Sequence, residues 1–173
     1  MRRHFVGSSL LAVVLAGGSA NAQNLNRVDQ RFVQLGIQDA MAQVKLAQLA
    51  QQNGSSQVVR DFGARMEADF SKVNDRLKEI ASSNSVTIPD TLRTKDQALY
   101  DRLSKLSGAQ LDREYMRAMV LYNVMDVAAF RRESQSASDA TVRDLATKTL
   151  PVLEENLKIA RDDSTKLGIS AAK

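Results

Sequence analysis

The stretches VRDFG at residues 59–63 and VRDLA at residues 142–146 are two forms of one short sequence, 83 positions apart in a chain of 173 residues. Both have the spacing of apolar and charged residues that is typical of an amphipathic helix. The repeat predicts two similar helical hairpins packed together as one four-helix bundle. Two unrelated amphipathic helices would also give so short a match by convergence, and this alternative stays open.

Apolar residues continue at helical spacing on both sides of these stretches. Asn26 and Ser56 are expected as N-caps of the first two long helices, and Ser107 with Gln110 has the spacing of a capping box. Pro151 should kink the last helix. The long helices are predicted over about residues 28–52, 57–82, 107–134 and 140–166, with a connector at 84–94 and a short helix that holds Leu99, Leu103 and Leu106.

The residue types exclude several kinds of chemistry. The sequence has no Cys, and its one His is His4. Thiol catalysis, disulfide scaffolds and iron–sulfur sites need Cys, and the common nucleophilic sets need His as a base. No Gly-rich phosphate-binding loop is present. We therefore expect that the protein is not an enzyme and has no cofactor.

The first 22 residues have the order of regions that defines a secretory signal peptide. Arg2 and Arg3 give a basic start, residues 8–16 are largely apolar, and Ala20-Asn21-Ala22 is a cleavage site of small residues. The apolar run is too short to span a membrane. We expect one helical domain over residues 23–173, with its core at about 27–167. We also expect a periplasmic or extracellular location, with association with the outer membrane as an alternative.

The charge of the expected mature chain is close to balanced. Without Arg2 and Arg3, 22 basic side chains stand against 20 acidic ones. Proteins that bind nucleic acid usually carry a pronounced basic surface. We therefore expect no nucleic-acid partner and no transmembrane segment after cleavage. The expected partner is an unknown envelope protein or a second copy of the chain.

Polar residues interrupt the apolar faces of the predicted helices. In the first helix, Asp39 lies on an inward arc together with Val28 and Leu35, and in the last helix the inward arc includes Val152. Helices of similar length that pack side by side bring their midpoints to one level. The sequence therefore predicts a polar layer halfway along the core. Its members are Gln43, Asp69, Tyr122, Asp126 and Asn156.

A buried carboxylate without a partner costs several kcal/mol, so this layer must be hydrogen-bonded, hydrated, metal-bound or protonated. One interpretation is a hydrogen-bonded layer that fixes the register of the helices. The other is a weak site for a small ligand or for Ca²⁺, Mg²⁺ or Mn²⁺, which accept oxygen ligands alone. No metal site is firm. The weak candidate ligands are Asp39, Asp69, Asp126 and Glu155.

Residues 44–50, 62–66, 115–120, 126–130 and 149–155 read VKLAQLA, FGARM, YMRAMV, DVAAF and TLPVLEE. In this order they resemble the exported bacterial family of domains of unknown function numbered 4142. The resemblance implies an all-α fold, a ferritin-like four-helix bundle of two helical hairpins with a short extra helix in the crossover. It implies a place in the cell envelope and no established activity.

The resemblance also implies a pattern of metal ligands from which this sequence departs. The family often has Glu at the position of Gln43, and His at the positions of Phe70, Asn123 and Asn156. A phenylalanine cannot ligate a metal, and Gln and Asn are weak oxygen donors. If relatives bind a transition metal at these positions, this chain is expected to have lost the site.

The outer face of the helix over 107–134 also carries a distinct pattern. Arg113, Arg117 and Arg131 share this face with Val120 and Val124. Such a pattern is usually a solvated face, and a stripe that binds a partner is the alternative.

The sequence as a whole predicts a non-enzymatic helical bundle that serves interactions in the cell envelope, or its maintenance under stress. The alternative is a metal-binding or small-ligand-binding protein that uses the mid-bundle carboxylates as a degenerate ferritin-like site.

Overall fold

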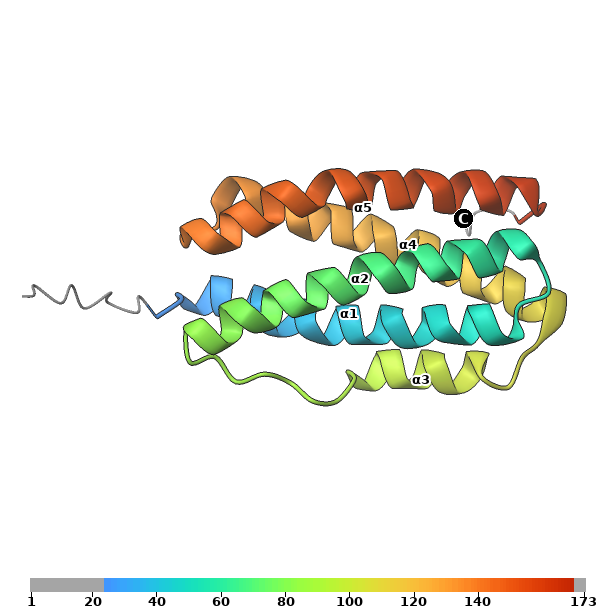
Figure 1. The fold of residues 1–173 in the computed structure, drawn as a ribbon, viewed down its shortest axis with the longest axis horizontal. Helices are drawn as coiled ribbons and strands as arrows, with labels where there is room; N and C mark the ends of the chain where they lie inside the picture. The colour runs from blue at the N-terminus through green and yellow to red at the C-terminus, as the bar shows by residue number, and fades with distance from the viewer. Residues whose placement is uncertain (1–23, 170–173) are drawn as a thin grey trace, which may run out of the picture.

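The computed structural model describes residues 24–169, and the predicted leader lies outside these residues. Four long helices lie side by side along the longest axis, and a short helix packs against them (Figure 1). The described part of the chain contains α1 (Arg27–Asn53), α2 (Gln57–Ser83), α3 (Thr94–Leu103), α4 (Gly108–Ser136) and α5 (Ala140–Lys166).

The long helices form two antiparallel hairpins, α1 with α2 and α4 with α5. This arrangement confirms the predicted all-α bundle of two hairpins with a short helix in the crossover. The crossover runs along α1, where the side-chain amides of Gln34 and Gln38 each donate to a backbone carbonyl of the connector, those of Thr87 and Thr91, at 3.1 Å. The connector and α3 thereby cover part of the seam between α1 and α4.

The first hairpin is packed closely because glycines lie at its interface. A Cβ on Gly63 would lie 2.9 Å from the carbonyl oxygen of Ala47, a distance that real Cβ atoms essentially never show. A side chain at this position would therefore push α1 and α2 apart.

Between the hairpins the core is filled by large apolar groups, among them the edge-to-face pair Phe32 and Phe130, whose ring centroids are 5.1 Å apart.

Each hairpin turn is held by an aspartate from the other hairpin. Asp112, near the start of α4, accepts hydrogen bonds from the backbone N–H of Ser55 at 3.0 Å and of Ser56 at 2.8 Å. The hydroxyl of Ser55 donates to the same carboxylate at 2.6 Å. The buried Asp112 thus satisfies backbone groups at the start of α2 that would otherwise lack partners.

The second turn repeats this contact with the hairpins exchanged. Asp29, near the start of α1, accepts from the backbone N–H of Asp139 at 2.7 Å and of Ser138 at 3.4 Å. Asp29 and Asp112 are 83 positions apart, as are the turns that they hold. The bundle therefore has an internal two-fold pseudosymmetry at the offset predicted from the VRDFG and VRDLA stretches.

The arginines of the two repeated stretches have the same role. The guanidinium of Arg60 donates to the carbonyl of Gly54 at 2.9 Å, and that of Arg143 donates to the carbonyl of Ala137 at 2.6 Å. Both bonds run from the start of a helix, α2 or α5, back to the hairpin loop that precedes it. The repeat is thus explained by shared turn chemistry as well as by amphipathic spacing.

All three predicted residues lie at N-cap positions, but only Asn26 makes side-chain capping bonds. Asn26 caps α1, and its side-chain oxygen accepts from the N–H groups of Val28 and Asp29 at 2.8 Å. Ser56 makes no side-chain capping bond, because Asp112 takes over the start of α2. Ser107 makes none either. Gly108, which follows it, has a φ of +60°, and this non-helical value displaces the serine from capping geometry.

Three apolar residues assigned to inward arcs are exposed. Val28 is 65% exposed and Leu35 is 37% exposed, because they lie where the seam between α1 and α4 is open. Val152 is 38% exposed beside a hollow between α2 and α5.

Helix α5 continues through Pro151, and the predicted kink stays a prediction. Within residues 24–169 no helix is long and apolar enough to cross a lipid bilayer.

Candidate functional site

The predicted polar residues of α1 and α4 meet at the seam between these helices. The buried side chain of Gln43 donates from Nε2 to Oδ2 of Asp39 and to Oδ2 of Asp126, each at 2.7 Å. Gln43 and Asp126 are 83 positions apart, so equivalent places in the two hairpins face each other across the pseudosymmetry axis. One amide therefore bridges two carboxyl groups inside the bundle.

Residues of the crossover extend this network. The guanidinium of Arg93 donates to Oδ1 of Asp39 at 2.6 Å and, through Nε, to Oδ2 of Asp96. Asp96 is fully buried and also accepts from the hydroxyl of Tyr122 at 2.6 Å. We call Asp39, Gln43, Arg93, Asp96, Tyr122 and Asp126 the seam network.

The charges of the seam network are set by burial and by neighbours. Burial raises the pKa of Asp126 well above its usual range, and the negative charge and hydrogen bond of Asp39 raise it further. The hydrogen bond from Gln43 and the charge of Arg93 lower it only in part. Asp126 therefore carries its proton under conditions where an ordinary aspartate is ionised, and it can donate that proton to Asp39. Burial and then the bond to Asp96 raise the pKa of Tyr122, which stays a neutral donor.

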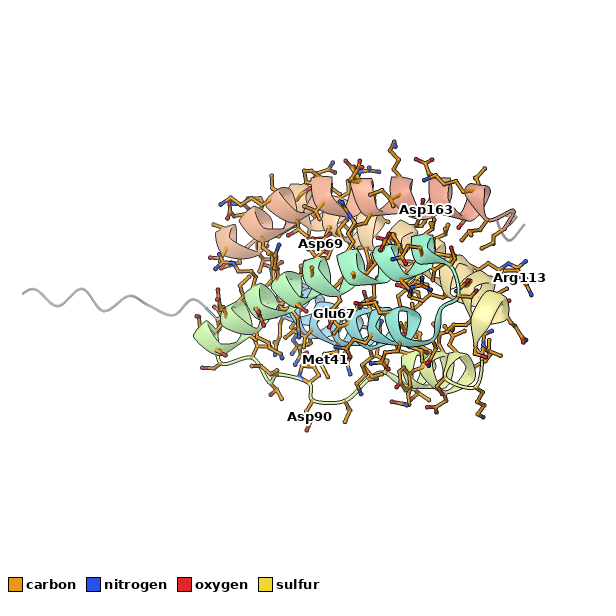
Figure 2. All side chains as sticks on the ribbon, turned by 45° about the vertical axis from the view of Figure 1, so that its right-hand side comes forward. Met41, Glu67, Asp69, Asp90, Arg113 and Asp163 are labelled. Atoms are coloured by element: carbon orange, nitrogen blue, oxygen red, sulfur yellow. The ribbon has the colours of Figure 1, made fainter. Side chains whose placement is uncertain are left out.

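A second polar group lies between α2 and α5. Asn156 is fully buried; its oxygen accepts from Nε of Arg65 at 2.6 Å, and its amide donates to Asp69 at 3.1 Å. Figure 2 shows Asp69 on the side of α2 that faces α5. The predicted layer is thus divided into two groups on opposite seams. Asp69 does not join Asp126.

The weak metal candidates do not assemble into one site. Only Asp39 and Asp126 come together, while Asp69 belongs to the other seam. Glu155 is exposed, because it precedes the buried Asn156 and so faces away from the core. In the described range of 24–169, no three Asp, Glu, His or Cys residues are grouped so that they could hold a metal ion.

Sequence reasoning missed Arg93 and Asp96, which come from the crossover and not from a long helix. The one local feature that points to them is that they lie three positions apart at the start of a short helix. An aspartate is favoured at this end of a helix. It also missed the unpartnered oxygen of Asn123, whose amide donates to the carbonyl of Met119 at 2.9 Å. Nothing in the helical periodicity points to these contacts.

A cleft of about 290 Å³ opens over the seam network. Asp39, Arg93 and Asp126 line it together with apolar groups that include Phe32 and Phe70. The cleft occupies the part of the α1–α4 seam that α3 leaves uncovered. Its size and mixed lining suit a small organic molecule better than a bare ion.

The outer face of α4 carries a regular row of side chains, of which all but the half-buried Glu114 are exposed. Figure 2 shows Arg113 pointing outward from the early part of this helix. The apolar members at the centre of the row are open to solvent, with Leu121 59% and Val124 39% exposed. We call the row the α4 stripe, and it consists of Glu114, Arg117, Leu121, Val124, Ala128 and Arg131.

Two hollows adjoin the α4 stripe. One, of about 520 Å³, lies between α4 and α5 and is lined by Val124, Leu157 and Arg161. The other, of about 630 Å³, is lined mainly by apolar groups from α3, α4 and the end of the described chain. Contiguous exposed apolar surface of this kind is typical of a binding face.

Comparisons with known proteins give a family and a fold. The family model described as a domain of unknown function (DUF4142) matches residues 14–162. The crystal structure of a DUF305 fragment from Deinococcus radiodurans is similar, with a TM-score of 0.71 and 16% sequence identity over 84% of this chain and 98% of that chain. At this identity the likeness shows the fold alone. The comparison with curated proteins found no match.

Proposed function

The chain belongs to the family of domains of unknown function DUF4142, and from this premise we propose that it is an exported, non-enzymatic interaction module of the bacterial cell envelope. The observation that carries the proposal is the α4 stripe, where Leu121 and Val124 are open to solvent between charged residues. Exposed apolar residues that are gathered together and rimmed by polar ones are typical of interaction sites.

The seam network supports a structural role for the polar core. Asp39 and Asp96 share the guanidinium of Arg93, and Asp126 is bridged by Gln43. Buried groups that satisfy one another in this way hold helices in register. The absence of Cys from the sequence, and of His beyond His4, agrees with a role that is not catalytic.

Export is the part of the proposal that rests on the first 22 residues. Their basic start, apolar run and small-residue triplet have the order of a signal peptide. The full chain, expressed in a bacterial host, should be recovered outside the cytoplasm with Gln23 as its first residue. N-terminal sequencing of the purified protein tests this, and an intact Met1 in the cytoplasmic fraction would contradict it.

The interaction role is tested by capture of crosslinked partners, a second copy included, from envelope extracts. We expect Val124→Lys to reduce the captured material, because it places a charge in the apolar centre of the α4 stripe. Val152→Lys is the matched control, since Val152 is 38% exposed and Val124 is 39% exposed, but on another face. Equal capture by both variants and by the unchanged chain would count against the proposal.

A small-ligand binding function at the cleft over the seam network is the second candidate. The observation that favours it is the mixed lining of the cleft, where Asp39, Arg93 and Asp126 meet apolar groups. A ligand that binds there would carry a donor group for a carboxyl oxygen. If this function is correct, protein purified from its compartment retains a stoichiometric small molecule after dialysis, and enlargement of Ala129 to Leu at the cleft wall lowers that retention.

A further inference from the structure

We propose that two copies of this chain bind each other through the outer faces of their α4 helices, which lie antiparallel about a two-fold axis beside Leu121 and Val124. The inference rests on the proposed interaction role and names the partner as a second copy of the chain. A two-fold axis lets one surface serve both copies, as in the commonest homodimers.

The spacing of the α4 stripe favours a second helix as its partner. Its positions, 114, 117, 121, 124, 128 and 131, are three or four residues apart throughout. This is the pattern of the a and d positions along the seam of a coiled coil. The centre of the stripe is apolar and exposed, whereas the opposite face of α4 already packs in the core through residues such as Tyr115 and Met119. Helix α4 therefore presents a second seam, and no helix of the described chain covers its apolar centre at Leu121 and Val124.

The charges at the two ends of the stripe favour an antiparallel partner. An axis midway between positions 122 and 123 sets Leu121 opposite Val124 of the second copy, and Glu114 opposite Arg131 of the second copy. Parallel packing in register would instead bring Glu114 against its own equivalent and Arg131 against its own. Opposite charges at both ends therefore favour the antiparallel arrangement, and like charges oppose the parallel one.

Space beside the stripe also favours this partner. Two hollows of about 520 and 630 Å³ follow one another along the stripe, one beside Ala128 and Arg131 and the other beside Arg117 and Leu121, and both are also lined by α5. Side chains of a second α4 can enter these hollows, as the ridges of one helix fill the grooves beside another. Leu157 in the first hollow and Leu99 in the second give this contact an apolar floor.

Ion pairs within the chain do not prevent this contact. Arg131 bonds to Glu154 at 2.6 Å, and Glu114 bonds to Arg102 at 2.8 Å and to Arg117 of the stripe itself at 3.0 Å. These side chains are partly exposed, and such surface pairs contribute little to stability. A guanidinium has five N–H donors, so Arg131 can keep Glu154 and also meet a carboxylate of the second copy.

The test is the oligomeric state of the full exported chain, measured by sedimentation velocity over a series of protein concentrations. We expect a concentration-dependent dimer. The double variant Leu121→Lys with Val124→Lys should raise its dissociation constant at least about tenfold, because it buries charge at the centre of the interface. Val152→Lys, at a similarly exposed valine on another face, should leave the dissociation constant unchanged.

A charge exchange tests the antiparallel register. Glu114→Arg and Arg131→Glu should each weaken the dimer, and the two together should restore part of the lost affinity, because the exchanged charges again face each other across the axis. The restoration is partial because each exchanged residue also meets a like charge of its own chain, Arg102 or Glu154. Positions 114 and 131 are about 25 Å apart along one helix, so they cannot compensate for each other within one chain. Circular dichroism of each variant checks that the helices are intact, and Glu114→Gln with Arg131→Gln gives a second comparison that adds no repulsion.

The outcomes separate this inference from the proposed function. A monomer at all concentrations, or a dimer that Leu121→Lys with Val124→Lys leaves intact, overturns the inference. A monomer that captures a different protein through the α4 stripe overturns the inference and leaves the interaction role standing. A monomer without any captured partner overturns both. Weakening by each single charge change without restoration by the pair overturns the antiparallel register.

Discussion

At the scale of single residues, the most informative position is Asp126. Its carboxyl group is buried beside Asp39 and is bridged to it by Gln43. Two charged carboxylates in this place would repel each other with little water to screen them. A proton retained on Asp126 removes the repulsion and supplies a donor. The raised pKa of Asp126 thus keeps two close negative charges out of the seam network at pH values below that pKa.

Two replacements of Asp126 should separate the loss of its hydrogen bonds from the loss of its titratable proton. We expect Asp126→Ala to lower the free energy of unfolding by about 3 kcal/mol, since it opens a cavity and leaves buried polar groups unpaired. Asp126→Asn should change it by less than about 1 kcal/mol, because its amide can accept from Gln43 and donate to Asp39. Urea unfolding followed by circular dichroism measures both values, and an alanine variant as stable as the unchanged chain would contradict the buried network.

The raised pKa of Asp126 also predicts how stability depends on pH. Between the usual aspartate pKa of the unfolded chain and the raised pKa of the folded one, the folded state binds more protons. The contribution of Asp126 to stability is thus full below this window and is lost as the pH rises through it. Asp126→Asn does not titrate, so its free energy of unfolding should improve relative to the unchanged chain as the pH rises. Parallel pH profiles of the two proteins would refute the raised pKa.

At the scale of elements, each hairpin turn depends on an aspartate from the other hairpin. Asp112 holds the turn before α2, and Asp29 holds the turn before α5. Each contact joins residues that are distant in sequence, so it links the two hairpins as well as ending a helix. Helix capping in this chain is therefore partly a tertiary interaction.

This dependence gives a prediction with a matched control. Asp112→Ala removes three hydrogen bonds to Ser55 and Ser56, and we expect it to lower the free energy of unfolding by about 2 kcal/mol. Ser56→Ala should cost less than about 0.5 kcal/mol, because the serine side chain makes no capping bond. Thermal and urea unfolding compare the two variants, and the reverse order would show that the local cap dominates.

The sequence predicts the elements well where local signals act. The bounds of the long helices lie within about two residues of those expected, because Asn26, Gly54 and the turn at 136–139 are local stops. Ser56 and Ser107 were wrong as side-chain caps, since a distant carboxylate and a positive φ at Gly108 decide those starts. Apolar periodicity shows which side of a helix is buried. It does not settle whether the one or two residues at the edge of that side are buried or exposed.

The candidate site is less predictable, since part of it comes from the crossover. Gln43 and Asp126 are found as polar interruptions of apolar faces, and their contact follows from the packing of α1 against α4. Arg93 and Asp96 join them only because the connector brings α3 over the same seam. Helical periodicity carries no information about where a connector lies. Glu155 was expected near the layer and is exposed, because one position along a helix turns a side chain by about 100°.

At the scale of the whole molecule, the two-fold pseudosymmetry places unlike groups at equivalent positions. Gln43 and Asp126 face each other across the axis, as one amide and one protonated acid, where identical acids would repel. The polar core thus joins the two hairpins, and the binding that we propose falls to the outer face of α4. This division between an architectural interior and an interactive exterior is the central claim.

Native mass spectrometry of the full chain, expressed with its leader in metal-replete medium and purified from its own compartment, tests this claim most directly. We expect a dimer whose mass is that of two mature polypeptides, with no retained metal or small molecule. A monomer that carries one metal ion or one small molecule per chain, and that loses it on Asp126→Asn substitution, would show instead that the interior binds a ligand.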